Sequence, residues 1–97
     1  PNLRFLDLNY DRTFNDEGMA ALSRMPGLTK LYLKGTSITD SGLAHLAPLT
    51  NLTELDLADT GITDAGLAHL TKLTRLRRLD LRAATITDAS LDVLRHM

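Results

Sequence analysis

The stretch that decides the fold of this chain is L-T-E-L-D-L-A-D-T-G-I-T-D-A-G-L-A-H-L-T-K-L, residues 52–73. The same pattern precedes it from Leu28 and follows it from Leu76, without gaps and at a spacing of 24 residues. All three copies keep leucines at the same places, except that Met97 replaces the last one in the third copy, together with an Ile-Thr-Asp triplet and a small residue two positions after the aspartate. Agreement at this many positions predicts a tandem-repeat architecture, in which each unit packs only on its neighbours.

A fourth, irregular copy precedes the other three. It has leucines at Leu3, Leu6 and Leu8 and an extra residue in the turn around 11–15. The repeats are therefore placed at residues 3–27, 28–51, 52–75 and 76–97. Because the chain starts just before a first leucine and ends within a repeat, we expect one domain that is a segment of a longer array. Neither end carries an evident cap, so residues 1–97 alone are expected to be marginally stable.

Each repeat is predicted to contain one short strand and one short helix. The L-x-L unit alternates with a period of two, which indicates a strand with its leucines inward. Thr39, Thr63 and Thr87 are residue types that begin helices, and an aspartate follows each in the first turn. Later leucines then fall on one helix face at i, i+3. Identical strands in successive repeats are expected to stack in parallel.

Two further positions recur for packing reasons. Gly18, Gly42, Gly66 and Ser90 are equivalent, and a small residue there allows neighbouring helices to approach closely. Thr36 and Thr60 are expected to hydrogen-bond turn backbone between repeats, since buried amides need partners.

The pattern L-x-x-L-x-L-x-x-T-x-I-T-D-x-G-L resembles that of the leucine-rich-repeat family over the whole chain. Its Ile-Thr-Asp part resembles the cysteine-containing, ribonuclease-inhibitor-like style, with threonine where that style often has cysteine or asparagine. The 24-residue length is most similar to bacterial repeats. The resemblance implies an α/β fold, a right-handed solenoid of about four repeats with parallel strands on the concave face and helices on the convex face. It also implies that the chain binds another protein on the concave face.

Composition narrows the functional classes. The net charge is −1, so no overall charge attracts nucleic acid or anionic membranes. There are no cysteines, no apolar run long enough for a membrane span and no visible signal peptide. No catalytic motif is present, and His45 and His69 are predicted to lie too far apart to share a metal. We therefore expect no enzymatic activity, no cofactor, no metal and no small-molecule substrate. The cellular compartment is left open.

The predicted binding surface consists of the strand positions between the inward leucines. Stacked strands bring them into three rows: Phe5, Lys30, Glu54 and Arg78; then Asp7, Tyr32, Asp56 and Asp80; then Asn9, Lys34, Ala58 and Arg82. Exposed aromatic residues on a sheet are typical partner contacts, whereas the alternating charges of the first row also suit cross-strand pairing. The candidate partner-binding residues are Phe5, Asp7, Tyr10, Lys30, Tyr32, Lys34, Glu54, Asp56, Arg78, Asp80 and Arg82.

Two alternative functions stay open. The repeats could be the substrate-recognition arm of a ubiquitin-ligase component or a secreted effector, which a flanking F-box or catalytic segment would reveal. Alternatively, five basic residues within 72–82 could bind a polyanion or nucleic acid. No aromatic residue is interleaved with these bases, so base stacking is not supported.

Overall fold

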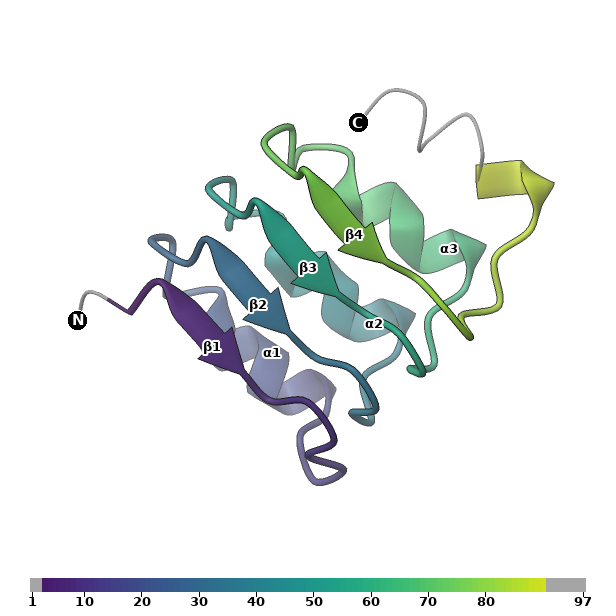
Figure 1. Cartoon of the computed structure of the whole chain (residues 1–97), viewed down its shortest axis with the longest axis horizontal. Helices are drawn as coiled ribbons and strands as arrows, with labels where there is room; N and C mark the ends of the chain where they lie inside the picture. Colours follow the sequence, from purple (N-terminus) through teal and green to yellow (C-terminus); the bar gives the residue numbers. More distant parts are fainter. Residues whose placement is uncertain (1–2, 91–97) are drawn as a thin grey trace.

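A computed structural model describes residues 3–90 of the chain. Strands and short helices alternate along it (Figure 1). The strands are β1 (Phe5–Asp7), β2 (Lys30–Tyr32), β3 (Glu54–Asp56) and β4 (Arg78–Asp80). The helices are α1 (Asp16–Leu22), α2 (Asp40–Leu43), α3 (Asp64–Leu67) and the 3₁₀ helices η1 (Ala44–Leu46), η2 (Ala68–Leu70) and η3 (Asp88–Ser90).

The strands form one parallel sheet in the order β1-β2-β3-β4. Leu6, Leu31, Leu55 and Leu79 are partners across the sheet, so the second leucine of every repeat occupies the same register position. The step from β1 to β2 is 25 residues, as in Phe5 to Lys30, whereas the later steps are 24. The extra residue in the first repeat therefore lies in its turn and leaves the register intact.

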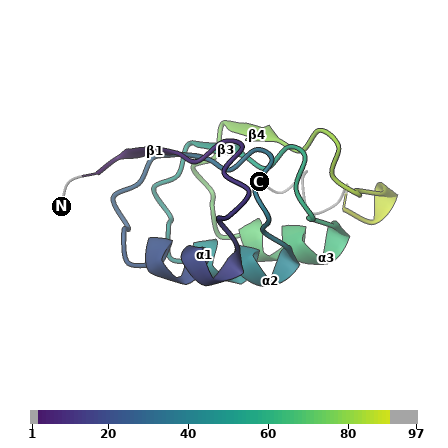
Figure 2. The same cartoon turned by 90° about the horizontal axis from the view of Figure 1, so that it is seen from below.

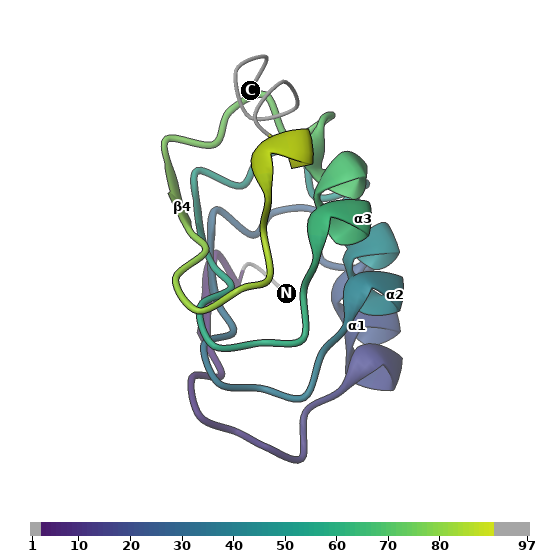
Figure 3. The ribbon, with the colours of Figure 1, turned by 90° about the vertical axis from the view of Figure 1, so that its right-hand side faces the viewer.

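Sheet and helices form two layers. The sheet covers one side of the molecule and α1, α2 and α3 lie side by side on the other (Figures 2 and 3). Neighbouring strands are about 4.8 Å apart, whereas packed helices are about 8–10 Å apart. A stack of such repeats bends toward the sheet, which becomes the concave face. The structure therefore confirms the predicted solenoid of about four repeats.

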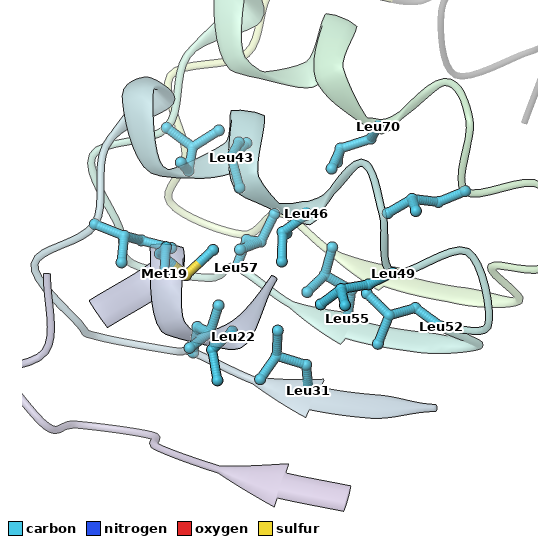
Figure 4. Close-up of a cluster of buried hydrophobic side chains, with 14 of the residues drawn as sticks. Met19, Leu22, Leu31, Leu43, Leu46, Leu49, Leu52, Leu55, Leu57 and Leu70 are labelled. Atoms are coloured by element: carbon cyan, nitrogen blue, oxygen red, sulfur yellow. The ribbon is translucent and has the colours of Figure 1, made fainter. Parts of the chain in front are cut away.

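Leucines from both layers fill the space between them (Figure 4). Leu31, Leu55, Leu43 and Leu67 are completely or almost completely buried, which confirms the predicted inward positions of strand and helix leucines. The equivalent residues of the outer repeats, such as Leu6 and Leu79, are only partly buried. Burial therefore depends on having a repeat on each side.

Each inner helix begins at the predicted threonine and changes geometry after one turn. Thr39 and Thr63 are extended N-cap residues, and Thr63 accepts a hydrogen bond from the N–H of Ala65. The α-helical turns then tighten into the 3₁₀ helices η1 and η2. The predicted helices are therefore shorter than a continuous amphipathic helix.

The aspartate that begins each of the helices α1, α2 and α3 connects its repeat to the next. Asp40 Oδ1 accepts the backbone N–H of Thr63 at 2.7 Å, and its Oδ2 accepts the Thr63 hydroxyl at 2.5 Å. Asp16 makes the same pair of bonds to Thr39, and Asp64 makes them to Thr87. The prediction that these aspartates serve helix starts was incomplete, because their carboxylates bond the helix start of the following repeat.

In the second and third repeats the recurring glycine makes room for this carboxylate, whereas Gly18 faces the Phe14 ring. A Cβ atom on Gly66 would overlap Asp40 Oδ1, and one on Gly42 would overlap Asp16 Oδ1. Ser90 occupies the equivalent position in the last repeat, and its hydroxyl donates to Asp64 Oδ1 at 2.5 Å. The glycine therefore allows a close approach, as predicted, and the group that approaches is the aspartate of the preceding repeat.

Thr36 and Thr60 do not bond between repeats, contrary to the prediction. The Thr36 hydroxyl donates to the carbonyl of Leu33 at 2.8 Å, and Thr60 donates to Leu57 at 2.7 Å. The turn after each strand brings the carbonyl three residues back within reach of the hydroxyl. Each threonine thus closes the turn of its own repeat.

One turn position has left-handed backbone in all four repeats. Its φ angles are 66° at Tyr10, 70° at Gly35, 53° at Asp59 and 63° at Ala83. The N–H groups of the first three residues bond carbonyls of the next repeat, so the solenoid itself imposes this conformation. Only Gly35 adopts it without steric cost.

Replacing Ala83 with glycine is expected to raise the free energy of unfolding by about 0.5–1 kcal/mol, because glycine removes the Cβ clash of left-handed backbone. The measurement is the urea midpoint at constant m-value. The opposite replacement, Gly35→Ala, should lower the midpoint, since the new Cβ also meets the Tyr10 ring at 2.9 Å. An Ala83→Gly variant that is less stable than the wild type contradicts this account.

Candidate partner-binding face

The first two predicted rows of side chains exist on the sheet. The register aligns Phe5, Lys30, Glu54 and Arg78 across the four strands, and two residues further on it aligns Asp7, Tyr32, Asp56 and Asp80. Their neighbours Leu6, Leu31, Leu55 and Leu79 point into the core. These eight outward residues, together with Asn9, Tyr10, Lys34 and Arg82, are called the concave face below.

The third predicted row lies in turns, because each strand is only three residues long. Asn9, Lys34 and Arg82 follow their strands at equivalent positions, and the Asn9 side chain accepts the Lys34 N–H at 2.8 Å. Ala58 is 2% exposed, so it is not the outward residue that the pattern predicted. Its carbonyl accepts the Gly35 N–H, and the backbone at this point is part of the turn network.

Aromatic side chains gather at the first two repeats. The Phe5 and Tyr32 rings meet edge to face, with centroids 5.0 Å apart and planes at 77°. Phe5 is 48% exposed and Tyr10 60%. The Lys34 ammonium lies 5.6 Å from the centre of the Tyr10 ring. The structure thus brings Phe5 and Tyr32 together and places Tyr10 separately, in the turn beside Gly35.

Glu54 holds Tyr32 and Lys30 in place. The Tyr32 hydroxyl donates to Glu54 Oε1 at 2.8 Å, and Lys30 Nζ lies 3.4 Å from Glu54 Oε2. The hydrogen bond raises the pKa of Tyr32 and lowers the pKa of Glu54. Of the charge pairs predicted along the first row, Lys30–Glu54 is formed. Arg78 is in none of the ion pairs found within residues 3–90.

The aspartates of the second row support the turns after their strands. Asp7, Asp56 and Asp80 each accept the backbone N–H two residues further on, at 2.9, 3.0 and 3.1 Å. Asp80 also pairs with the Arg82 guanidinium, with 2.7 Å between Oδ2 and Nη2. This hydrogen bonding lowers the pKa of Asp80 to about 2. Arg82 therefore offsets the repulsion between Asp80 and Asp56, its neighbour in β3.

These lowered pKa values predict a loss of stability in acid. The pKa of Asp80 is about 2 in the folded chain, and that of Asp64 is lowered by hydrogen bonds from Ser90 and Thr87. The unfolded values are about 4, so the stabilisation is complete above pH ~4 and is lost as the pH falls toward ~2. Urea midpoints between pH 7 and pH 2 measure it. In Asp80→Asn the urea midpoint should fall less between pH ~4 and pH ~2 than in the wild type. An equal fall in both proteins contradicts the contribution of Asp80 to acid unfolding.

A shallow hollow of about 120 Å³ lies in the middle of the concave face. Its lining consists of Asn9, Tyr32, Glu54, Leu55, Asp56, Arg78 and Asp80. Five of these belong to the predicted binding residues. Asn9 belongs to the third predicted row but not to the predicted partner contacts, and no sequence signal marks it, because its proximity to Tyr32 depends on how the turns stack.

The basic residues of the segment 72–82 do not lie together on one element. Lys72 follows η2 on the helix side, Arg75 bonds the Asn51 side chain at 2.8 Å in the connecting turn, and Arg78 is in β4. Arg82 pairs with Asp80. The charges are therefore spread around the last repeat.

Parallel strands in unbroken order, one short helix per repeat and a leucine core define a short α/β solenoid. The sequence matches a family model described as leucine-rich repeats in two copies over residues 50–96, and another described as a leucine-rich repeat over residues 26–47. The chain is a leucine-rich-repeat protein. Such repeats are generally non-catalytic and typically serve as protein-interaction modules. No helix within residues 3–90 is long and apolar enough to cross a membrane.

Solved structures with the same fold include an internalin (inlF) from Listeria monocytogenes. The two chains superpose with a TM-score of 0.55 and are 21% identical, over 80% of this chain and 29% of the internalin chain. This chain therefore spans less than a third of that protein, and the likeness concerns the fold. A search of curated proteins found no match.

Proposed function

We propose that this leucine-rich-repeat segment binds another protein through its concave face. The observation that carries the proposal is the pair of rings at Phe5 and Tyr32, presented on the sheet beside the hollow. Aromatic residues are frequent energetic anchors of interfaces. Tyr32 is held by Phe5 on one side and by Glu54 on the other, so little side-chain freedom is lost when a partner binds.

The other predicted residues differ in whether their charges are already paired within the sheet. Lys30, Glu54, Asp80 and Arg82 already pair with one another, so they contribute to shape and orientation more than to new ion pairs. Arg78, Asp7 and Asp56 offer charges for the partner. Tyr10 and Lys34 extend the surface to the turns. The partner-binding residues proposed are the eleven predicted from the sequence, with Asn9 added.

We further infer that the repeats are the threonine-containing counterpart of the cysteine-containing style, in its bacterial 24-residue form, and that the segment belongs to a larger recognition protein. The buried hydroxyl of Thr36, which bonds its own turn, supports the first inference. A role as the recognition arm of a ubiquitin-ligase component or secreted effector depends on a flanking F-box or catalytic segment. Polyanion binding receives less support, because the bases of residues 72–82 are dispersed.

The proposal is tested with face-specific variants of the immobilised chain. Tyr32→Ala combined with Lys34→Ala should reduce capture of partner proteins at least tenfold, since it removes a central ring and a rim charge. The matched control combines His69→Ala with Lys72→Ala, two exposed positions on the helix side. Thermal melts establish that both variants are folded. Partner capture that survives the first pair and fails with the control places binding on the helix side and refutes the proposal.

A further inference from the structure

We propose that the hollow on the concave face receives a basic side chain, the guanidinium of an arginine or the ammonium of a lysine, from the bound partner segment. This inference rests on the proposed function and names the chemistry at its centre. Binding through the aromatic rings alone would not require a cation, whereas this inference places one between Tyr32 and Asp56.

The lining of the hollow has the charge and the surface for such a group. Three of its side chains are carboxylates, at Glu54, Asp56 and Asp80, and one is a guanidinium, at Arg78. The Tyr32 ring forms another part of the lining. An aromatic face attracts a cation through its quadrupole, and a carboxylate forms short, charge-assisted hydrogen bonds with it.

Asp56 is the carboxylate that is open to a ligand. The cations bound to the other two lie toward solvent, since the Lys30 and Arg82 side chains are 48% and 76% exposed. Asp56 pairs with no cation within residues 3–90, and its carboxylate accepts one hydrogen bond, from the N–H of Ala58 through Oδ1. Its Oδ2 is thus available as an acceptor beside the ring.

The size of the hollow and the charged residues around it determine where the partner's cation would lie. The hollow, at about 120 Å³, is several times larger than the roughly 10–15 Å³ needed for one water molecule, and it is open to solvent, so a small side-chain head can enter it. Arg78 lies in β4 beside Glu54, also lines the hollow, and disfavours a cation near itself. The Lys34 ammonium lies 5.6 Å from the centre of the Tyr10 ring and forms no ion pair with Asp56 within residues 3–90. The favoured position is therefore against Tyr32 and Asp56, away from Arg78.

The experiment uses the whole chain, labelled with ¹⁵N, and three small probes. They are N-acetyl-arginine methylamide, its neutral isostere N-acetyl-citrulline methylamide, and N-acetyl-glutamate methylamide. We expect saturable amide shifts at Tyr32, Asp56 and Asp80 with the arginine probe, with a Kd on the order of 1 mM for so small a ligand. The citrulline probe should bind at least tenfold more weakly, and added salt should weaken only the arginine probe.

Variants assign the effect to the hollow. Asp56→Asn keeps the acceptor for the Ala58 N–H and should weaken the arginine probe at least fivefold. Arg78→Gln should strengthen it. Glu17→Gln, an exposed acid-to-amide change on the helix side, is the matched control and should have no effect.

Four results would overturn the inference. Two concern affinity: the citrulline probe binds as tightly as the arginine probe, or the glutamate probe binds more tightly than the arginine probe. Two concern position: the arginine probe shifts amides outside the hollow only, or it shifts none in the hollow at probe concentrations up to about ten times the expected Kd. The proposed function stands if partner capture still depends on Tyr32 and Lys34 while the arginine probe fails. The reverse combination, a probe that binds and a partner that uses the helix side, refutes the proposed function alone.

Discussion

Replacing Asp40 with alanine is expected to lower the free energy of unfolding by about 2–3 kcal/mol, because two hydrogen bonds to a charged acceptor are lost. Asp40 accepts both the backbone N–H and the hydroxyl of Thr63, 23 residues further along the chain. Its removal leaves the Thr63 N–H without that partner and loosens the contact between the second and third repeats. Urea denaturation, followed by circular dichroism, measures the change.

Gly66 provides the sharper part of this test. Gly66→Ala alone should destabilise the chain, although alanine is the better helix former by about 1 kcal/mol, since its Cβ overlaps Asp40 Oδ1. In the Asp40→Ala background the overlap with the carboxylate is gone and a tight contact with the Leu43 methyl at 3.0 Å remains, so Gly66→Ala should cost clearly less than in the wild type. Gly66→Ser should be milder than Gly66→Ala, because Ser90 shows that a hydroxyl at this position can donate to the aspartate.

The double-mutant cycle has a clear contrary outcome. If Gly66→Ala costs the same with and without Asp40, the glycine serves only the packing of neighbouring helices. In that case the aspartate of the preceding repeat is not the reason that the glycine recurs.

Leu55→Ala is expected to lower the free energy of unfolding by about 3–5 kcal/mol, the range for a fully buried leucine whose surroundings cannot collapse. Leu55 is 1% exposed and lies between Leu31 and Leu79 in the sheet. Leu6 occupies the same position in β1 but is only partly buried. Leu6→Ala should therefore cost about half as much or less.

Both leucine variants are compared by urea midpoint and by melting temperature. A solenoid whose stability is a sum of repeat and neighbour contributions predicts the larger loss at the inner repeat. Equal losses at Leu6 and Leu55 contradict that description, because they require burial at the first repeat to match burial at the third.

The repeated pattern was sufficient to predict the strands, their parallel order and the inward leucines, because these features depend on residue type and period alone. It also predicted which side chains share a row, since equal spacing sets the register. In the first row the pattern does not predict every pairing. Lys30 pairs with Glu54, as the alternating charges indicate, but the other carboxylate oxygen of Glu54 accepts the Tyr32 hydroxyl and Glu54 makes no ion pair with Arg78.

Other features depend on distances that a sequence pattern does not contain. An aspartate in a first helical turn satisfies the rule for helix starts, so nothing in the pattern reveals that Asp40 bonds Thr63 instead. Ala58 continues the outward alternation, but β3 ends at Asp56 and the turn buries it. A glycine indicates the left-handed turn position only at Gly35. The other repeats have Tyr10, Asp59 and Ala83 there, which are residue types that do not predict a positive φ angle.

The proposed binding face is tested most directly by photo-crosslinking from single positions. Benzoylphenylalanine in place of Phe5, an exposed ring on the concave face, is compared with the same residue in place of His69 on the helix side. We predict that a partner protein crosslinks from position 5 and that this product is absent from position 69. Crosslinking from position 69 without crosslinking from position 5 would contradict binding on the concave face.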